Sequence, residues 1–138
     1  MRPALAAAVG LSLLAIASCG NGESPQGGGT TATGPAARRL TSAEQALVAR
    51  SERTVQRYCG KLALSLTGQA RPPSLEDASR AFAATDRLIE LARAKPAASS
   101  ENGVAMGLFL GDLAEDLEGS NCDSRLVERI DQGLATLP

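Results

Sequence analysis

Apolar residues recur at intervals of three and four along four separate stretches of the chain, which is the spacing of amphipathic α-helices. The expected helices cover about residues 41–66, 74–95, 101–118 and 121–136. Segments rich in Gly, Pro, Ser and Asn separate these stretches. The pattern therefore predicts an all-α fold, a single four-helix bundle in up-down-up-down order over residues 40–138.

Start and stop signals mark the first two expected helices. A hydroxyl at Thr41 or Ser42 starts the first and Ser74 starts the second, in each case ahead of acidic residues that suit the helix dipole. Residues 71–73, Arg-Pro-Pro, break the chain between them, and Pro96 follows the second helix. We expect these two helices to pack along each other.

The same periodicity predicts which side of each helix faces the core. On the first helix the apolar stripe comprises Leu47, Val55, Tyr58, Cys59, Leu62 and Leu66. On the second it has the spacing of a coiled-coil seam and comprises Leu75, Ala78, Phe82, Thr85, Ile89 and Ala92. On the fourth it comprises Cys122, Leu126, Ile130, Leu134 and Leu137.

The third expected helix is the most apolar, with a nearly unbroken run from Val104 to Leu110. Ser99 or Ser100 is its expected cap, and we expect it to be the central, most buried helix. Glycine recurs every fourth residue, at Gly103, Gly107 and Gly111. This spacing predicts that another backbone approaches closely. Membrane insertion is the alternative, but the run is short and Asp112 interrupts it.

A basic stripe lies opposite the apolar side of the first expected helix. Its members are Arg50, Arg53, Arg57 and Lys61. Since each residue advances about 100° around the axis, these side chains fall within an arc of roughly 80°. One hypothesis is an interaction surface for anionic headgroups or an acidic partner. The simpler expectation is a solvated face whose attraction to anionic surfaces fades as salt rises.

An acidic cluster lies at the end of the third expected helix. Its members are Asp112, Glu115, Asp116 and Glu118. Clustered carboxylates bind Ca²⁺, but a Ca²⁺ loop alternates its ligands around a sharp Gly turn, and this segment lacks that spacing. We expect a solvated acidic face and no resident metal, with a weak cation site as the alternative.

The first 19 residues differ in character from the rest. A basic start at Met1-Arg2 precedes an apolar run from Ala4 to Ala17, which is the layout of a secretory signal peptide. This run is shorter than the ~20 apolar residues that span a bilayer. A branched residue, two small residues and a cysteine then follow as Ile16-Ala17-Ser18-Cys19. Residues 1–19 therefore resemble the lipobox-type signal peptide of bacterial lipoproteins.

This resemblance implies that a diacylglyceryl group is attached to Cys19 and that cleavage falls between Ser18 and Cys19. The new amino terminus is then open to acylation, for example by palmitate, and two or three acyl chains form a durable membrane anchor. The implied organisation is a signal peptide over 1–18, a flexible Gly-, Ser- and Thr-rich tether over 19–39 and a helical domain over 40–138. The implied location is extracytoplasmic, lipid-anchored to the bacterial cell membrane.

Export also predicts the state of the other two cysteines. The chain has three Cys, and with Cys19 lipidated, Cys59 and Cys122 should form a disulfide outside the cytoplasm. Both residues lie on apolar stripes, so the bond should lie in the core. It should join the first helix to the start of the fourth.

Composition excludes several functional classes. The chain has 14 basic residues, of which Arg2 lies in the signal, so the mature chain has 13 basic and 15 acidic residues. With two Phe, one Tyr and no Trp besides, it lacks the basic and aromatic character of nucleic-acid binders. It has no His, the usual general base of hydrolases and the commonest zinc and haem ligand. We expect no nucleic-acid partner, no cofactor and no enzymatic activity.

The sequence thus favours a non-catalytic helical interaction or envelope-accessory module, with the membrane and an envelope protein as its partners. The alternative is a lipoprotein that binds a small ligand or cation, either in a crevice beside the third helix or at the acidic cluster. An enzyme is the weakest hypothesis, because no nucleophile elbow, phosphate loop or metal-ligand motif supports it.

Overall fold

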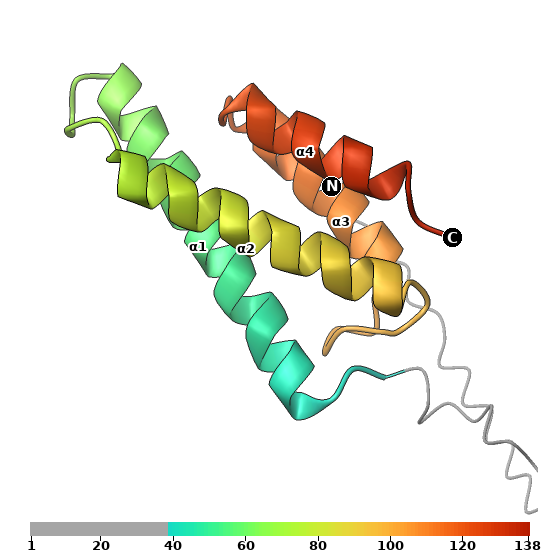
Figure 1. Cartoon of the computed structure of the whole chain (residues 1–138). Coiled ribbons are helices and arrows are strands. Elements are labelled where there is room, and N and C mark those ends of the chain that lie inside the picture. The colour runs from blue at the N-terminus through green and yellow to red at the C-terminus, as the bar shows by residue number, and fades with distance from the viewer. Residues whose placement is uncertain (1–38) are drawn as a thin grey trace, which may run out of the picture. The chain divides into compact units, whose positions relative to one another are not determined.

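The structure, a computed structural model, describes residues 39–138, so the predicted lipoprotein signal, Cys19 and nearly all of the predicted tether lie outside it. Within this range the chain forms four helices and no extended strand. They are α1 (Ser42–Leu66), α2 (Leu75–Ala94), α3 (Met106–Gly119) and α4 (Ser124–Leu134). The predicted all-α domain of four helices is confirmed (Figure 1). None of these described helices is long and apolar enough to cross a membrane.

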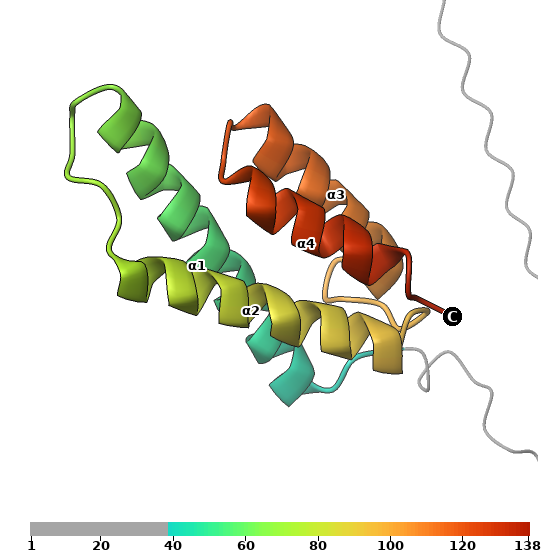
Figure 2. The same cartoon turned by 45° about the horizontal axis from the view of Figure 1, so that its top comes forward.

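The central helix is α2, although the sequence assigned that place to the third helix. It packs along α1 and also against both helices of the α3–α4 hairpin (Figures 1 and 2). Small side chains make this possible, because Ala81 and Ala92 are fully buried and Ala84 is almost so. By contrast α3 packs closely only against α4 and α2. The predicted central position of the third helix is therefore wrong.

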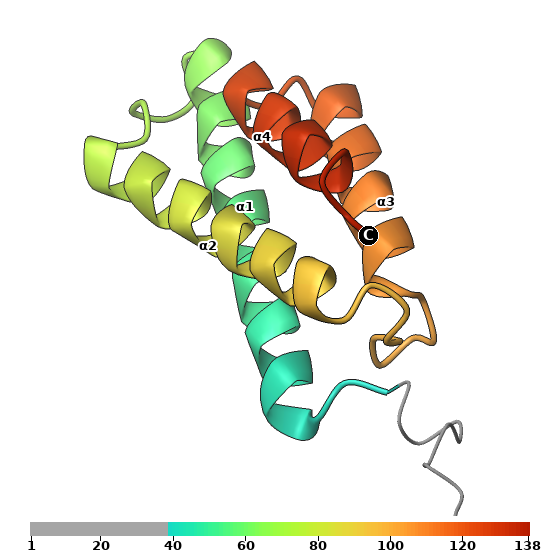
Figure 3. The ribbon, with the colours of Figure 1, turned by 45° about the vertical axis from the view of Figure 1, so that its right-hand side comes forward.

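Successive helices run in alternating directions, as the up-down-up-down order predicts. The α1–α2 and α3–α4 connections lie at one end of the domain (Figures 1 and 3). The α2–α3 connection and the C terminus lie toward the other end. The two hairpins therefore meet side by side, with α2 as the helix that both share.

Reciprocal hydrogen bonds cap α1 and α2 at their predicted starts. The Thr41 hydroxyl accepts from the N–H of Glu44 at 3.3 Å, and the Glu44 carboxylate accepts from the N–H of Thr41 at 2.8 Å. Ser74 and Asp77 form the same pair of bonds, both at 3.1 Å. Lys95, which follows α2, donates to Glu44 at 2.7 Å. The end of α2 is thereby fastened to the start of α1.

The start of α3 lies later than predicted, because the expected capping serines have other partners. The N–H of Leu40 donates to the carbonyl of Ser99 at 3.1 Å, and the N–H of Ser100 donates to the carbonyl of Val104 at 2.8 Å. Gly103 takes a φ of 77°, which this turn requires and which suits glycine. The helix therefore starts without a side-chain cap. Leu40 is 4% exposed and belongs to the core.

The tip of the α1–α2 hairpin lies outside the core. Leu66 is 72% exposed and Leu75 is 91% exposed, so the prediction that both are core residues is wrong. The last buried residue of α1 is Cys59 and the first of α2 is Ala81, which leaves the end of this hairpin without a covered apolar face. The residues that α1 buries are Val48, Ser51, Val55, Tyr58 and Cys59.

The tight glycine contact is not at the predicted spacing. Gly103 lies before α3, and an added Cβ at Gly111 would meet nothing within 4 Å. An added Cβ at Gly107 would make an ordinary contact of 3.5 Å. An added Cβ at Gly133 of α4 would lie 2.8 Å from three side-chain atoms of the buried Ile89. The close approach predicted for the third helix is therefore found where α4 crosses α2.

Gly133→Ala should destabilise the domain, because its methyl group requires Ile89 to move within a packed core. Overpacking of this kind costs about 1–3 kcal/mol, more than the ~0.5–1 kcal/mol that Ala gains over Gly in a helix. Gly111→Ala meets open space and should stabilise the domain instead. Urea denaturation of both variants measures the two effects, and a change of the same sign in both would contradict this assignment.

Candidate functional site

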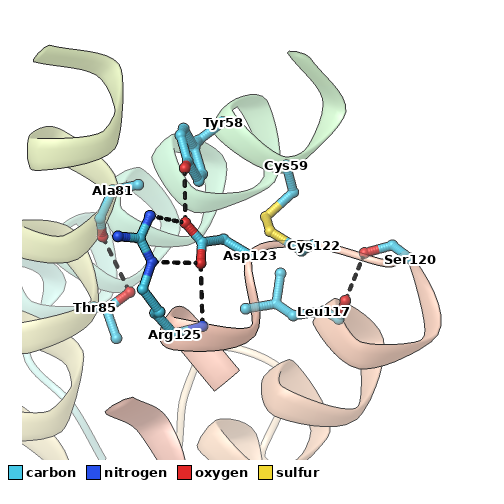
Figure 4. The surroundings of a disulfide bond; sticks show 9 residues. All are labelled: Tyr58, Cys59, Ala81, Thr85, Leu117, Ser120, Cys122, Asp123 and Arg125. Atoms are coloured by element: carbon cyan, nitrogen blue, oxygen red, sulfur yellow. Dashed lines mark hydrogen bonds and ion pairs between the residues drawn. A yellow bond between two sulfur atoms is a disulfide. The ribbon is translucent and has the colours of Figure 1, made fainter. Parts of the chain in front are cut away.

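A disulfide fastens α1 to the turn between α3 and α4 (Figure 4). The Cα atoms of Cys59 and Cys122 are 5.1 Å apart, and the two residues are separated by 63 positions in sequence. The predicted bond is confirmed, although Cys122 lies in the turn just before α4 rather than within the helix. Since α1 and α3 are not among the closely packed helix pairs, this bond adds a covalent link between α1 and the turn that follows α3.

A carboxylate beside the disulfide joins α1 to α4 (Figure 4). Asp123 accepts hydrogen bonds from the Tyr58 hydroxyl at 3.0 Å and from the Arg125 guanidinium at 3.0 and 2.7 Å. The Arg125 bonds outweigh the effect of burial and lower the pKa of Asp123 from 3.8 to about 2. Burial first, and then the bond to Asp123, raises the pKa of Tyr58. These three side chains are thus engaged in holding helices together.

A groove, which we call the α1–α3 groove, runs between these two helices where they do not pack closely. Its first part has a volume of about 290 Å³, and its second part, of about 280 Å³, continues it toward Cys59. Both parts are lined by Leu113 and Asp116, so they lie next to each other along α3. The walls of the first part include Val48, Ala49 and Glu52 from α1 and Phe109, Asp112 and Asp116 from α3.

The charge on the walls of this groove is wholly negative. The four carboxylates that line it are Glu52, Glu101, Asp112 and Asp116, and neither part is lined by Lys or Arg. None of the four forms an ion pair within residues 39–138. The side chains of Val48 and Leu113 supply an apolar floor. An apolar floor between acidic walls suits a group that is apolar and positively charged.

The predicted acidic cluster is divided by the structure. Asp112 and Asp116 line the α1–α3 groove, whereas Glu115 and Glu118 do not. Over the described part of the chain, no three His, Cys, Asp or Glu side chains are grouped as the ligands of a metal ion would be. The alternative of a weak cation site at this cluster therefore gains no support.

The predicted basic stripe lies on the exposed face of α1 and does not line the groove. Lys61 pairs with Asp77 of α2 at 3.1 Å. Arg50, Arg53 and Arg57 form no ion pair with any residue of the described domain. The role of this stripe as an interaction surface stays a prediction.

Sequence reasoning missed the contributions of Glu52 and Glu101 to the site. Glu52 lies between the arginines of the basic stripe in sequence, and Glu101 lies in the loop before α3, so neither stands out by charge alone. A signal was nevertheless present on one flank of the first helix, where no large apolar side chain occurs. Its members are Ala49, Glu52, Gln56, Gly60 and Ala63, and they recur at threes and fours.

Comparison with protein-family models, with curated proteins and with solved structures finds no match for this chain. The features of this chain that bear on function are the α1–α3 groove, the disulfide and the resemblance of residues 1–19 to a lipoprotein signal.

Loss of the disulfide should destabilise the domain equally from either side. On the chain-entropy model, closing a loop of this length lowers the entropy of the unfolded chain and so stabilises the fold by about 4 kcal/mol. Cys59→Ser and Cys122→Ser should therefore lower the melting temperature alike, and the double variant should add little. Reduction of the native protein should reproduce the effect, and a reduced protein as stable as the oxidised one would rule out this role.

Asp123 should make the domain sensitive to acid. Because its pKa of about 2 is below the ordinary 3.8, its charge stabilises the fold above that ordinary value and the stabilisation is lost as pH falls toward 2. A shift of this size corresponds to about 2 kcal/mol. Asp123→Asn should lower the unfolding free energy near neutral pH and reduce its fall in acid.

The matched control for this measurement is Asp112→Asn, because Asp112 is exposed and forms no ion pair with the described residues. Urea denaturation at a series of pH values compares the two variants with the native protein. The control should keep the native pH dependence. If Asp123→Asn also keeps it, the network at Asp123 does not stabilise the fold in this way.

Proposed function

We propose that this protein is a lipid-anchored, extracytoplasmic lipoprotein whose helical domain is a non-catalytic module that binds an envelope protein. The tetrapeptide that ends at Cys19 supports the anchor. The Cys59–Cys122 bond is consistent with export, because disulfides persist in oxidising compartments. The observation that carries the binding role is the α1–α3 groove, an apolar-floored hollow that helix packing leaves open.

A protein partner suits this groove better than an enclosed metabolite does. The volume of its first part, about 290 Å³, lies at the lower limit of the ~300–1,000 Å³ found for ligand pockets. A hollow of about 440 Å³ beside α4 is an open surface depression. Binding of a small ligand remains the alternative function, and it would use the same groove.

The chemistry of the groove favours binding over catalysis. The chain has no His, and the polar side chains on the walls are carboxylates, amides and hydroxyls without a basic partner. The buried Thr85 hydroxyl donates to the carbonyl of Ala81 at 3.0 Å, so this potential nucleophile is engaged within α2 (Figure 4). The groove residues therefore do not form a nucleophile–base pair, and they give no support to a catalytic function.

Site-specific photo-crosslinking in intact cells tests the proposed function. A photoreactive residue in place of Ala49, on the groove wall, should form adducts with a discrete envelope protein. The same residue in place of Ala83, on the exposed side of α2, is the matched control and should give none above background. Equal crosslinking at both positions, or none at either in normally abundant protein, would contradict the binding role.

The same strains with Cys19→Ala test the anchor. The variant should leave the membrane fraction and lose the mass of its acyl chains, because both proposed attachments to lipid, the sulfur and the new amino terminus, are on Cys19. Its circular dichroism should be unchanged, since Cys19 lies outside the helical domain. A variant that stays in the membrane fraction with its native mass would refute the lipoprotein assignment.

A further inference from the structure

We propose that the α1–α3 groove binds a basic amphipathic helix of the partner protein. This inference rests on the binding role proposed above and specifies the chemistry of the partner. The bound helix places Lys or Arg side chains against Glu52, Asp112 and Asp116. It places apolar side chains on the floor between them.

The negative charge of the groove determines that its partner is positively charged. Asp112 and Asp116 lie one turn apart on the α3 wall, Glu52 lies on the α1 wall, and Glu101 lies at the end formed by the α2–α3 loop. No basic side chain of the described domain pairs with any of these four. An acidic partner is therefore repelled from the first part of the groove, where both walls carry carboxylates, whereas a basic partner is attracted to it.

The apolar surface of the groove calls for more than a simple cation. Val104 and Phe109 line its first part and are partly exposed. A purely polar cation leaves these side chains in contact with water. The partner therefore needs apolar anchors as well as positive charge.

The shape of the α1 wall admits a helix backbone. Ala49, Gly60 and Ala63 line it with small side chains, and an added Cβ at Gly60 would meet nothing within 4 Å. At 1.5 Å per residue the α1 wall from Gln45 to Ala63 is about 27 Å long and the α3 wall from Phe109 to Leu117 is about 12 Å long, so a helix laid along α1 meets both walls over about 8 of its residues. Length, apolar anchors and flanking charge together are what a helix-in-groove interaction uses.

The test uses a fluorescent amphipathic peptide of about 18 residues, made of Leu and Lys, and the complete mature chain carrying Cys19→Ala with its disulfide intact. Fluorescence anisotropy measures the Kd. Gly60→Leu places a larger side chain in the groove, where it competes with the peptide for the same space. The Kd should therefore rise about tenfold. Gly111→Leu is the matched control, because it also replaces a helical glycine in open space but does not line the groove. Its Kd should stay within about twofold of the native value.

A second pair of variants tests the charge. Asp112→Asn combined with Asp116→Asn should weaken binding roughly fivefold. Glu115→Gln combined with Glu118→Gln removes the same charge from the same helix outside the groove, and should have little effect. A peptide with Glu in place of Lys should not bind. Addition of salt should weaken binding of the Lys peptide.

Three results would overturn the proposal: binding of the Glu peptide, equal loss of affinity in the groove and control variants, or displacement of the Lys peptide by spermine at equal concentration. The last result would show that charge alone suffices. If Ala49 crosslinks a partner in cells but the Lys peptide does not bind, the basic helix is wrong and the binding role stands. If neither occurs, both proposals fail.

Discussion

The disulfide between Cys59 and Cys122 is the constraint on which the arrangement of the two hairpins depends. The two hairpins pack against each other through α2, which contacts both α3 and α4. By contrast, α1 and α3 lack an extensive interface of their own. The bond joins α1 to the α3–α4 turn, and the Tyr58–Asp123 hydrogen bond repeats that connection beside it. The spacing of α1 and α3 is therefore set by covalent geometry at one end of the pair. Between the two helices the α1–α3 groove stays open over the apolar floor that Val48 and Leu113 supply.

The two walls of that groove differ in character. The α1 wall has small residues, such as Gly60 and Ala63, which make the groove wider, and the α3 wall has the carboxylates of Asp112 and Asp116. Glu52 adds a carboxylate on the α1 wall, so both walls of the first part carry negative charge. The groove therefore attracts a cationic group.

Sequence patterns predicted the structure where its causes are local. The caps at Thr41 and Ser74 follow from hydroxyls and carboxylates a few residues apart. The patterns failed where distant segments compete, because Ser99 bonds to Leu40 and does not cap a helix. The groove could not be predicted for the same reason, because its walls come from α1 and α3, which are far apart in sequence. Periodicity gives the apolar side of a helix, but it does not give the neighbour that covers it.

The pairing of Leu40 with Ser99 has a mechanical consequence if the domain is held by the tether proposed for residues 19–39. A pull on the chain ahead of residue 39 acts first on this hydrogen bond, on the buried Leu40 side chain and on the Lys95–Glu44 ion pair. Residues between Cys59 and Cys122 are closed into a covalent loop that such a pull cannot extend. Load would therefore unravel the N-terminal turns of α1 first. That would remove one wall of the first part of the groove and release a bound partner under tension.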